Sequence, residues 1–392
     1  MENCKYLIIG GGMTADAAVH GIRETDKSGT IVMLSAEKHA PYDRPPLSKK
    51  LWQGKPLDSI WRRTGEAGVD LRLNTAATDG DASKKTVTDS RGRTYAYEKL
   101  LLATGGTPRR LPGAHAEVIY FRTLDDYQYL RKHALPGTTV AVIGGGFIGS
   151  EIAAALTLNG CRVTMIFPDR GIGAHVYPAA LSDFISGYYR DKGVTLRAGE
   201  SVQAIEKSGT KFSVRTDKGE PVAADVVVAG IGIEPDVTLA RRLGLKVDNG
   251  VVVDEFLRAS PPDVYAAGDV ANFYNPALDR RMRVEHEDNA NTMGAMAGRN
   301  MAGSEERYHH LPYFYSDLFD LGYEAVGTLD TRLEIFEDWK EPFREGVVYY
   351  LKDGRVRGVL LWNVWEQVEA ARALIGTPDR FTTASLKRRI GG

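Results

Sequence analysis

One local pattern occurs twice in the chain and constrains its fold more than any other feature. The first copy, KYLIIGGGMTADAAVHGI, passes from a short apolar run through a glycine cluster into small and apolar residues at helical spacing, and the apolar run TIVMLSAE follows. The second copy, TTVAVIGGGFIGSEIAAALTLNGCRVTMIFPD, has the same order. Strand, tight turn, helix and strand predict the dinucleotide-binding unit of a doubly wound parallel sheet. Ordinary strand-to-helix turns also contain glycines, but two copies in one chain favour two nucleotide-binding domains.

Small residues in each turn let bare backbone approach a pyrophosphate, which the N-terminus of the helix then faces. They also let the helix pack closely on its strand. The candidates are Gly10, Gly12 and Ala15 in the first copy and Gly144, Gly146 and Gly149 in the second.

An acid at the end of the second strand typically binds the ribose hydroxyls of a dinucleotide. Asp169 has this place in the second copy, where its charge would repel the additional phosphate of NADP, so we expect NADH to be preferred. Arg170, the next residue, would instead favour NADPH. In the first copy Glu37 is the nearest acid after the second strand. The alternative interpretation is that Glu37 is an ordinary surface acid at a strand end.

Composition narrows the classes of protein to consider. The 392 residues exceed one ordinary core, so we expect two or three domains. A net charge of -1 gives no reason to bind nucleic acid, and no apolar run approaches bilayer length. The two cysteines, Cys4 and Cys161, form no CxxC motif, and no secretory signal pattern opens the chain, so we expect a reduced, cytoplasmic setting.

The remaining sequence alternates apolar runs with turn signals. EKLLLATGG, ADVVVAGIGIEPD and PDVYAAGDVAN predict buried strands that end in glycine. After MAGSEERYHHLP the segments YEAVGTLD, REGVVYYLKDG and RVRGVLLWNVW alternate and are rich in aromatic residues, and the amphipathic EQVEAARALIG follows. This pattern predicts an antiparallel sheet with a helix, and hence a third domain.

The segment PYDRPPLSKKLW has two adjacent prolines, an arginine before them and a lysine after them. Taken alone, it predicts a proline-rich turn with solvated basic side chains.

Seven motifs in order along nearly the whole chain resemble the FAD-dependent pyridine-nucleotide reductases of glutathione-reductase-like fold. They are PYDRPPLSKKLW, EKLLLATGGTPRRL, VIGGGFIGSEIAAAL, GIGIEPD, VYAAGDVAN, RVEHEDNA and YSDLFDLGYEAVG. Within these reductases the chain resembles the ferredoxin-reductase and apoptosis-inducing-factor branch. The resemblance implies an α/β fold with two glutathione-reductase-like Rossmann-type domains and a C-terminal α+β interface domain. The FAD-binding domain would comprise residues 1–115 and 248–308, the NAD(H)-binding domain 116–247 and the interface domain 309–392.

The resemblance also implies the residues that bind FAD. The prolines, beginning with Pro45, would fix an extended backbone along the flavin ring, Arg44 would contact FAD, and Lys49 would reach the reactive nitrogen. Asp269 would accept a ribityl hydroxyl, and it is also placed to cap a helix. The strand-end positions of the FAD site are Ala103, Thr104, Gly105 and Arg109.

On the NAD side, Glu151 would face Lys49 and keep its charge oriented toward the reduced flavin. Phe147 would stack near the nicotinamide. Glu285 and His286 would lie near both flavin and nicotinamide, so that Lys49, Glu151 and His286 are the catalytic candidates. Further NAD-side candidates are Ile148, Gly232 and Tyr315.

Two positions depart from the family pattern. Ala36 stands where the family usually has its FAD ribose acid, so that this role either shifts to Glu37 or is lost. Tyr315 replaces the usual tryptophan before Ser-Asp, which leaves its contribution to nicotinamide stacking open.

The resemblance implies an enzyme in which NADH reduces FAD and the electrons pass to an acceptor. This acceptor would be a ferredoxin-type iron-sulfur protein, a quinone or a metal chelate. Without a CxxC next to the flavin, a disulfide substrate is disfavoured. The alternative is an NADH-sensing flavoprotein that forms a long-lived charge-transfer complex and changes its oligomeric state or partner. We expect FAD and NADH as cofactors, no metal site, and a monomer or homodimer.

Overall fold

The computed structural model describes residues 1–391 and forms two compact units. The first unit consists of Met1–Arg44, Leu57–Thr107 and Glu234–Pro312. The second unit consists of Pro45–Pro56, Pro108–Ile233 and the chain from Tyr313 onward. The chain passes between the units in the strands β7 (Gly106–Pro108) and β16 (Ile233–Pro235). The division into three domains inferred above remains a prediction.

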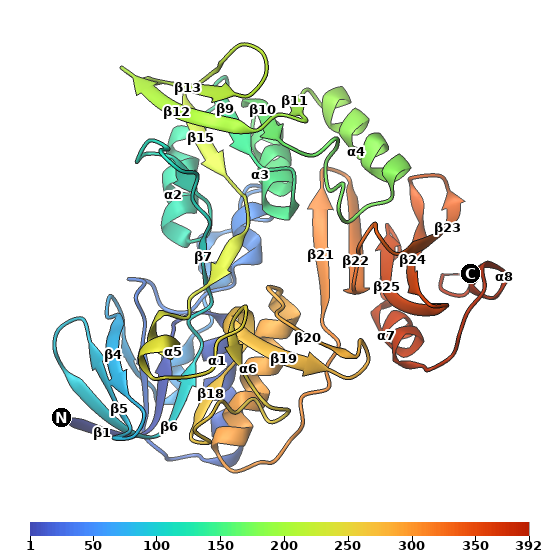
Figure 1. The fold of residues 1–392 in the computed structure, drawn as a ribbon. Helices are drawn as coiled ribbons and strands as arrows, with labels where there is room; N and C mark the ends of the chain where they lie inside the picture. Colours follow the sequence, from blue (N-terminus) through green and yellow to red (C-terminus); the bar gives the residue numbers. More distant parts are fainter. Residues whose placement is uncertain (392) are drawn as a thin grey trace. The chain divides into compact units, whose positions relative to one another are not determined.

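A seven-stranded sheet, five strands of which pair in parallel, forms the centre of the first unit (Figure 1). Its order is β3-β2-β1-β6-β5-β4, with β18 paired to β6. The pairs β1–β2, β2–β3, β1–β6 and β6–β18 are parallel, whereas β4, β5 and the start of β6 form an antiparallel meander. The strands are β1 (Glu2–Ile9), β2 (Ile31–Leu34), β3 (Asp70–Arg72), β4 (Ala77–Asp81), β5 (Thr86–Asp89), β6 (Thr94–Leu102) and β18 (Val264–Ala266).

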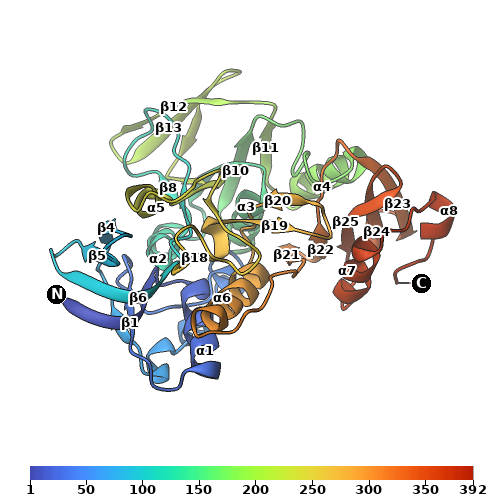
Figure 2. The ribbon, with the colours of Figure 1, turned by 60° about the horizontal axis from the view of Figure 1, so that its bottom comes forward.

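Two helices of the first unit, α1 (Met13–Thr25) and α6 (Glu287–Met301), lie side by side (Figures 1 and 2). Glycines on α6 permit this close approach. A Cβ on Gly294 would lie 2.4 Å from the carbonyl oxygen of Thr14, and one on Gly298 would lie 2.1 Å from that of Ala18. Two segments far apart in sequence therefore build one helix layer.

Smaller elements complete the first unit. The strands β17 (Val251–Val252), β19 (Ala271–Asn275) and β20 (Arg280–Met282) form a small sheet. The short helices are η2 (Leu57–Ile60), η3 (Thr64–Ala67), α5 (Thr238–Arg242) and η4 (Gly268–Val270).

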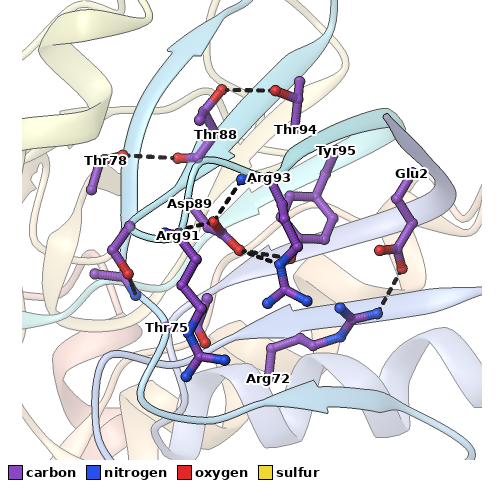
Figure 3. Close-up of polar contacts among 12 residues, drawn as sticks. Glu2, Arg72, Thr75, Thr78, Thr88, Asp89, Arg91, Arg93, Thr94 and Tyr95 are labelled. Carbon is purple, nitrogen blue, oxygen red and sulfur yellow. Dashed lines mark hydrogen bonds and ion pairs between the residues drawn. The ribbon is translucent and has the colours of Figure 1, made fainter.

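The turn between β5 and β6 is organised by one buried carboxylate (Figure 3). Asp89 accepts hydrogen bonds from the backbone N–H groups of Arg91 and Arg93, at 2.8 and 2.9 Å, and from the Tyr95 hydroxyl at 2.8 Å. Burial raises the pKa of Asp89, but these donors outweigh burial and lower it from its usual value. The meander is thus closed by a charged group that stays ionised.

A second parallel sheet, of order β11-β10-β9-β15-β8, forms the centre of the nucleotide-binding part of the second unit. Its strands are β8 (Ile119–Tyr120), β9 (Thr139–Ile143), β10 (Arg162–Phe167), β11 (Thr195–Ala198) and β15 (Val226–Ala229). The helices are α2 (Leu124–His133), α3 (Phe147–Leu158) and α4 (Ala179–Asp191). A separate antiparallel sheet contains β12 (Val202–Ser208), β13 (Lys211–Thr216) and β14 (Val222–Ala224).

The C-terminal segment of the second unit is an antiparallel sheet of order β21-β22-β25-β24-β23 (Figure 1). Its strands are β21 (Tyr313–Leu318), β22 (Leu321–Gly327), β23 (Glu334–Glu341), β24 (Glu345–Lys352) and β25 (Arg355–Trp362). The helix α7 (Val368–Gly376) packs on β22 and β25, and α8 (Thr383–Leu386) follows. Two Rossmann-type sheets and a C-terminal α+β part confirm the predicted fold class.

Candidate functional site

The glycine turn of the first unit forms an anion cradle. Gly10 follows β1 at a φ of 125°, and a Cβ there would lie 2.1 Å from the carbonyl oxygen of Ala103 at the end of β6. Gly12 precedes α1, and among residues 1–391 no side chain caps this helix. The guanidinium of Arg44 lies 4.0 Å from where a Cβ on Gly12 would be. Uncapped N–H groups, open space and a positive charge fit a pyrophosphate.

Arg44 is held by Glu37. The carboxylate accepts from the Arg44 guanidinium and from the Tyr42 hydroxyl, the latter at 2.6 Å. Burial lowers the pKa of Arg44, but Tyr42, Glu37 and Asp269 outweigh burial and raise it. Each oxygen of Glu37 thus has a donor within the protein. This geometry favours Glu37 as the partner of Arg44, and a ribose-binding role for it remains a prediction.

The carboxyl ends of β1, β6 and β18 meet at one edge of the sheet because these strands are parallel. After β6, the Thr104 hydroxyl donates to the carbonyl of Asp236 at 2.7 Å, and Gly105 adopts a φ of 65°. After β18, Asp269 lies inside η4, whose N-cap residue is Ala267. Asp269 is therefore at the sheet edge with Gly10, and helix capping was the wrong alternative for it.

Glu285 and His286 lie directly before α6, and His286 is its N-cap residue. Arg283 forms an ion pair with Glu285 at 2.5 Å and donates to the backbone oxygen of Asp269 at 3.1 Å. Arg283 therefore links two predicted site positions. Arg283 was not predicted as a site residue, although it stands two residues before Glu285 in the motif RVEHEDNA.

The glycine turn of the second unit repeats the first. A Cβ on Gly144 would lie 2.4 Å from the Gly230 carbonyl oxygen, and one on Gly149 would lie 2.1 Å from that of Gly144. Gly146 has nothing within 4 Å of its Cβ position, and no side chain in the described chain caps α3 there. The uncapped helix N-terminus and the open space at Gly146 would also fit a phosphate group.

Two further predicted residues flank this turn. Phe147 begins α3 and its ring lies 5.4 Å from that of Phe314 on β21, while Ile148 is partly exposed. On the neighbouring loop, Gly232 adopts a φ of 90°, and its carbonyl accepts from the backbone N–H of Arg109 at 3.0 Å.

Asp169 lies two residues after β10, the place that a ribose-binding acid requires. Its carboxylate also contacts the Nε2 atom of His175 at 2.9 Å, in a partly exposed setting. His175 was not predicted, because no pattern in the sequence marks a histidine six residues downstream as a neighbour.

The Lys49–Glu151 ion pair is buried, with exposed side-chain fractions of 8% and 3%. The Lys49 ammonium donates to Oε2 of Glu151 at 2.8 Å. The Ser48 hydroxyl donates to the same oxygen at 2.6 Å, and the Ser316 hydroxyl donates to Oε1 at 2.6 Å. The ammonium also lies 5.2 Å from the Tyr315 ring centroid, a cation–π distance. Neither serine was predicted.

The backbone before Lys49 differs from the prediction. We expected the prolines to hold an extended segment, but Pro45–Ser48 forms the short 3-10 helix η1. Proline fixes φ near -65°, a value that the 3-10 helix shares with extended polyproline structure, so φ alone did not decide between them. Whether Pro45 contacts a cofactor remains a prediction.

Within residues 1–391, no three His, Cys, Asp or Glu side chains gather as a metal site would require. Over the same range, no helix is both long and apolar enough to span a bilayer.

Comparison with known families gives two matches. Residues 4–294 match the family described as pyridine nucleotide-disulphide oxidoreductase. Residues 297–339 and 336–377 match the C-terminal domain described as that of the mitochondrion-associated apoptosis-inducing factor.

Similar proteins include an apoptosis-inducing factor, a ferredoxin reductase component and monodehydroascorbate reductases. The chain is 32% identical to mitochondrial apoptosis-inducing factor 1 of Dictyostelium discoideum, over 96% of this chain and 79% of that protein. It is 34% identical to the ferredoxin–NAD(+) reductase component of the anthranilate 1,2-dioxygenase system of Burkholderia cepacia, over 94% and 93%.

Among solved structures, the covalent putidaredoxin reductase–putidaredoxin complex matches with a TM-score of 0.89 and 30% identity, over 96% of this chain and 94% of that one. A ferredoxin reductase from Rhodopseudomonas palustris matches with a TM-score of 0.90 and 27% identity, over 97% and 96%.

Proposed function

The chain belongs to the pyridine nucleotide-disulphide oxidoreductase family and is an NAD(P)H-dependent FAD oxidoreductase, and on this premise we propose that its reductant is NADH and its acceptor a small iron-sulfur protein. The support for this acceptor is the similarity over nearly the full length to a ferredoxin–NAD(+) reductase component and to a reductase solved in complex with putidaredoxin. The support for NADH is the carboxylate of Asp169 at the strand end of the second unit.

The two cysteines support an acceptor other than a disulfide. Cys4 and Cys161 are both free and buried. Burial raises the pKa of Cys4 to about 12 and also raises the pKa of Cys161. A thiol relay needs an accessible thiolate, which neither residue supplies.

We assign the two nucleotide sites to the residues predicted for them. FAD, when bound, supplies a centre that accepts a hydride and releases electrons to a one-electron acceptor. The residues proposed to hold it are Gly10, Gly12, Ala15, Glu37, Arg44, Pro45, Lys49, Ala103, Thr104, Gly105, Arg109, Asp269, Glu285 and His286. Those proposed for NADH are Gly144, Gly146, Phe147, Ile148, Gly149, Glu151, Asp169, Gly232, Glu285 and Tyr315.

The buried Lys49–Glu151 pair is the observation that carries a catalytic role. Its ammonium is excluded from water and fixed in direction by Oε2 of Glu151. A fixed positive charge in a dry site stabilises negative charge that develops nearby, without reorganisation of solvent. We assign this task to Lys49, the orientation of the ammonium to Glu151, and a place in the same reaction to His286.

The second candidate function is an NADH-sensing flavoprotein. It is supported by the match of the C-terminal residues to the apoptosis-inducing-factor domain and by the relative from Dictyostelium discoideum. In this case the response to NADH would be a change of oligomeric state or partner.

Anaerobic stopped-flow mixing with NADH separates the two functions. Fast bleaching of the flavin, followed by fast reoxidation when an iron-sulfur protein is added, is the result expected of the reductase. Slow bleaching with a long-lived band at long wavelength would favour the sensor. Reoxidation by quinones or metal chelates alone would contradict the proposed acceptor.

We further propose a cytoplasmic protein, since both cysteines are free thiols. We also propose that the protein is a monomer or a homodimer. Light scattering of the protein with and without NADH tests the oligomeric state. Larger assemblies would contradict this proposal.

A further inference from the structure

The carboxylate of Glu151 is held by three segments of the second unit that are distant in sequence. Ser48 and Lys49 come from η1 and the residue after it, Glu151 from α3, and Ser316 from β21. Two of the donors share Oε2, whereas in the described chain Ser316 is the one donor to Oε1. Ser316 is itself almost fully buried, with 1% exposed.

A buried carboxylate oxygen that loses its donor is left without a hydrogen bond, which costs free energy and lets the carboxylate turn. Among the described residues Oε1 has no second donor to replace Ser316, and Glu151 is 3% exposed. The orientation of the carboxylate that holds Lys49 therefore depends on a hydroxyl of the C-terminal sheet.

We propose that Ser316 is a positioning residue for the Lys49–Glu151 pair: its hydroxyl holds Oε1 of Glu151, so that Oε2 stays directed at the Lys49 ammonium. This inference rests on the catalytic role proposed above for the pair. The neighbouring residue strengthens it, since Tyr315 on the same strand contacts the ammonium with its ring. Strand β21 is an edge strand, and its successive residues 315 and 316 contact both members of the pair.

The groups that face Glu151 set its electrostatic surroundings. Lys49 is the cation that contacts it, and the nearby carboxyl of Asp317 has a pKa raised by burial and further by the Glu151 charge, against the opposing effect of Lys49. The tyrosine neighbours have pKa values raised by burial and by Glu151, and so remain neutral hydroxyls; they are Tyr177, Tyr189 and Tyr323. Ser316 and Ser48 are thus the hydroxyls that donate to the carboxylate.

The test is the rate of flavin reduction by NADH in Ser316→Ala, measured by stopped-flow mixing at saturating NADH. We expect this rate to fall about tenfold, the order of effect of a lost hydrogen bond to a charged group. The FAD midpoint potential, measured by spectroelectrochemistry, should become more negative, because a misdirected ammonium stabilises the reduced flavin less. Ser316→Thr, which retains the hydroxyl, should restore both, and Ser316→Cys, a weaker donor, should lie between them.

A double-mutant cycle distinguishes positioning from a general loss of packing. In a Glu151→Gln background the charged partner of Lys49 is already removed, so adding Ser316→Ala should leave the rate and the potential of that background unchanged. The matched control is Tyr350→Phe, which removes a buried hydroxyl from the same sheet; that hydroxyl donates to the carbonyl of Val176 at 2.6 Å and does not touch the pair. This variant should keep the rate and the potential of the parent.

An unchanged rate and potential in Ser316→Ala and Ser316→Cys, with Lys49→Ala impaired, would overturn the role of Ser316 while leaving the proposed function intact. The same effect of Ser316→Ala in the Glu151→Gln background as in the parent would also overturn it. Unchanged flavin reduction in both Lys49→Ala and Glu151→Gln would instead reject the proposed role of the pair. If Ser316→Ala does not fold, the comparison of Ser316→Cys with Ser316→Thr provides the test of the role of Ser316.

Discussion

At the scale of single residues, two buried carboxylates show the difference between a structural group and a group placed for chemistry. They differ in where their hydrogen-bond donors come from. The Asp89 carboxylate has its donors within one turn, so it organises local structure. The Glu151 carboxylate draws its donors from distant segments and aligns an ammonium. Removing one partner of a buried ion pair leaves the other charge uncompensated. Neutral replacements of each partner therefore test what the pair contributes.

Lys49→Ala should slow flavin reduction by NADH about a hundredfold to a thousandfold, the order of effect of removing one preorganised donor from an active site. Stopped-flow bleaching at a fixed NADH concentration measures it. The adjacent Lys50 is exposed and provides the control, since Lys50→Ala changes the same net charge outside the buried pair. Equal rates for the parent and Lys49→Ala would remove Lys49 from the site.

Asp169→Ala should lower kcat/KM for NADH by about tenfold to a hundredfold and bring the value for NADPH closer to that for NADH, because a hydrogen-bonding charge at the ribose is worth roughly 1.5–3 kcal/mol. Steady-state kinetics with both coenzymes measure the change. His175→Ala removes the neighbour of Asp169 but leaves its carboxylate, and should keep NADH preferred. A parent protein that already prefers NADPH would show the ribose argument to be wrong.

At the scale of elements, the strand-to-helix turns were predictable from sequence and the side-chain network around Glu151 was not. The spacing of the glycines in the motif identifies Gly10 and Gly144. Each lies in a turn packed so closely on a neighbouring segment that no Cβ fits there. Ser316 meets Glu151 only through the folding of β21, and no local pattern encodes that contact. The segment from Pro45 was predicted extended because proline constrains φ and leaves ψ free.

Gly10→Ala should destabilise the protein and weaken FAD binding, since its Cβ would lie 2.1 Å from the Ala103 carbonyl oxygen. We expect a loss of roughly 2 kcal/mol or more, combining a left-handed φ with a steric clash. Denaturant unfolding and FAD content measure it. The control is Gly92→Ala, where φ is 77° but nothing lies within 4 Å of the Cβ position, so only the conformational strain is added. Equal losses in both variants would exclude the clash as the cause.

Asp89→Asn should lower stability at neutral pH and lose its effect in acid. The pKa of Asp89 is lowered in the folded protein, so its ionised form contributes stability above the usual aspartate pKa of about 3.9, and this contribution disappears as the pH falls through the folded value. Thermal unfolding from pH 7 down to pH 3 measures the difference between parent and variant. A difference that does not shrink at the acid end would mean that packing, and not charge, explains it.

At the scale of the whole molecule, each nucleotide turn belongs to a different compact unit, and the C-terminal sheet belongs to the unit with the second turn. The fold class could be predicted because both turns and the alternating aromatic strands are local patterns. The grouping of 45–56 with the second unit could not, since it arises from tertiary packing such as that of Lys49 with Glu151.

Removal of FAD should lower the thermal midpoint of the protein and adding FAD should restore it, because a ligand bound only by the folded state stabilises it by about 2.7 kcal/mol at a hundredfold excess over Kd. Differential scanning fluorimetry of protein stripped of FAD, with and without added FAD, measures this. The variant Gly12→Asp, which puts a negative charge into the first cradle, should abolish the restoration. A midpoint that does not respond to FAD in the parent would contradict the assignment of the cofactor.

The contact between α1 and α6 bears on how the chain is made. Helix α1 leaves the ribosome early, but the glycine-bearing helix that packs on it ends only at Met301. At roughly 5–20 residues per second, synthesis from Thr25 to Met301 takes on the order of fifteen to fifty-five seconds. The Pro108–Ile233 segment emerges during this wait. For that interval the surface of α1 that receives α6 is without its partner, so a nascent chain of this protein should engage chaperones at its N-terminal helix.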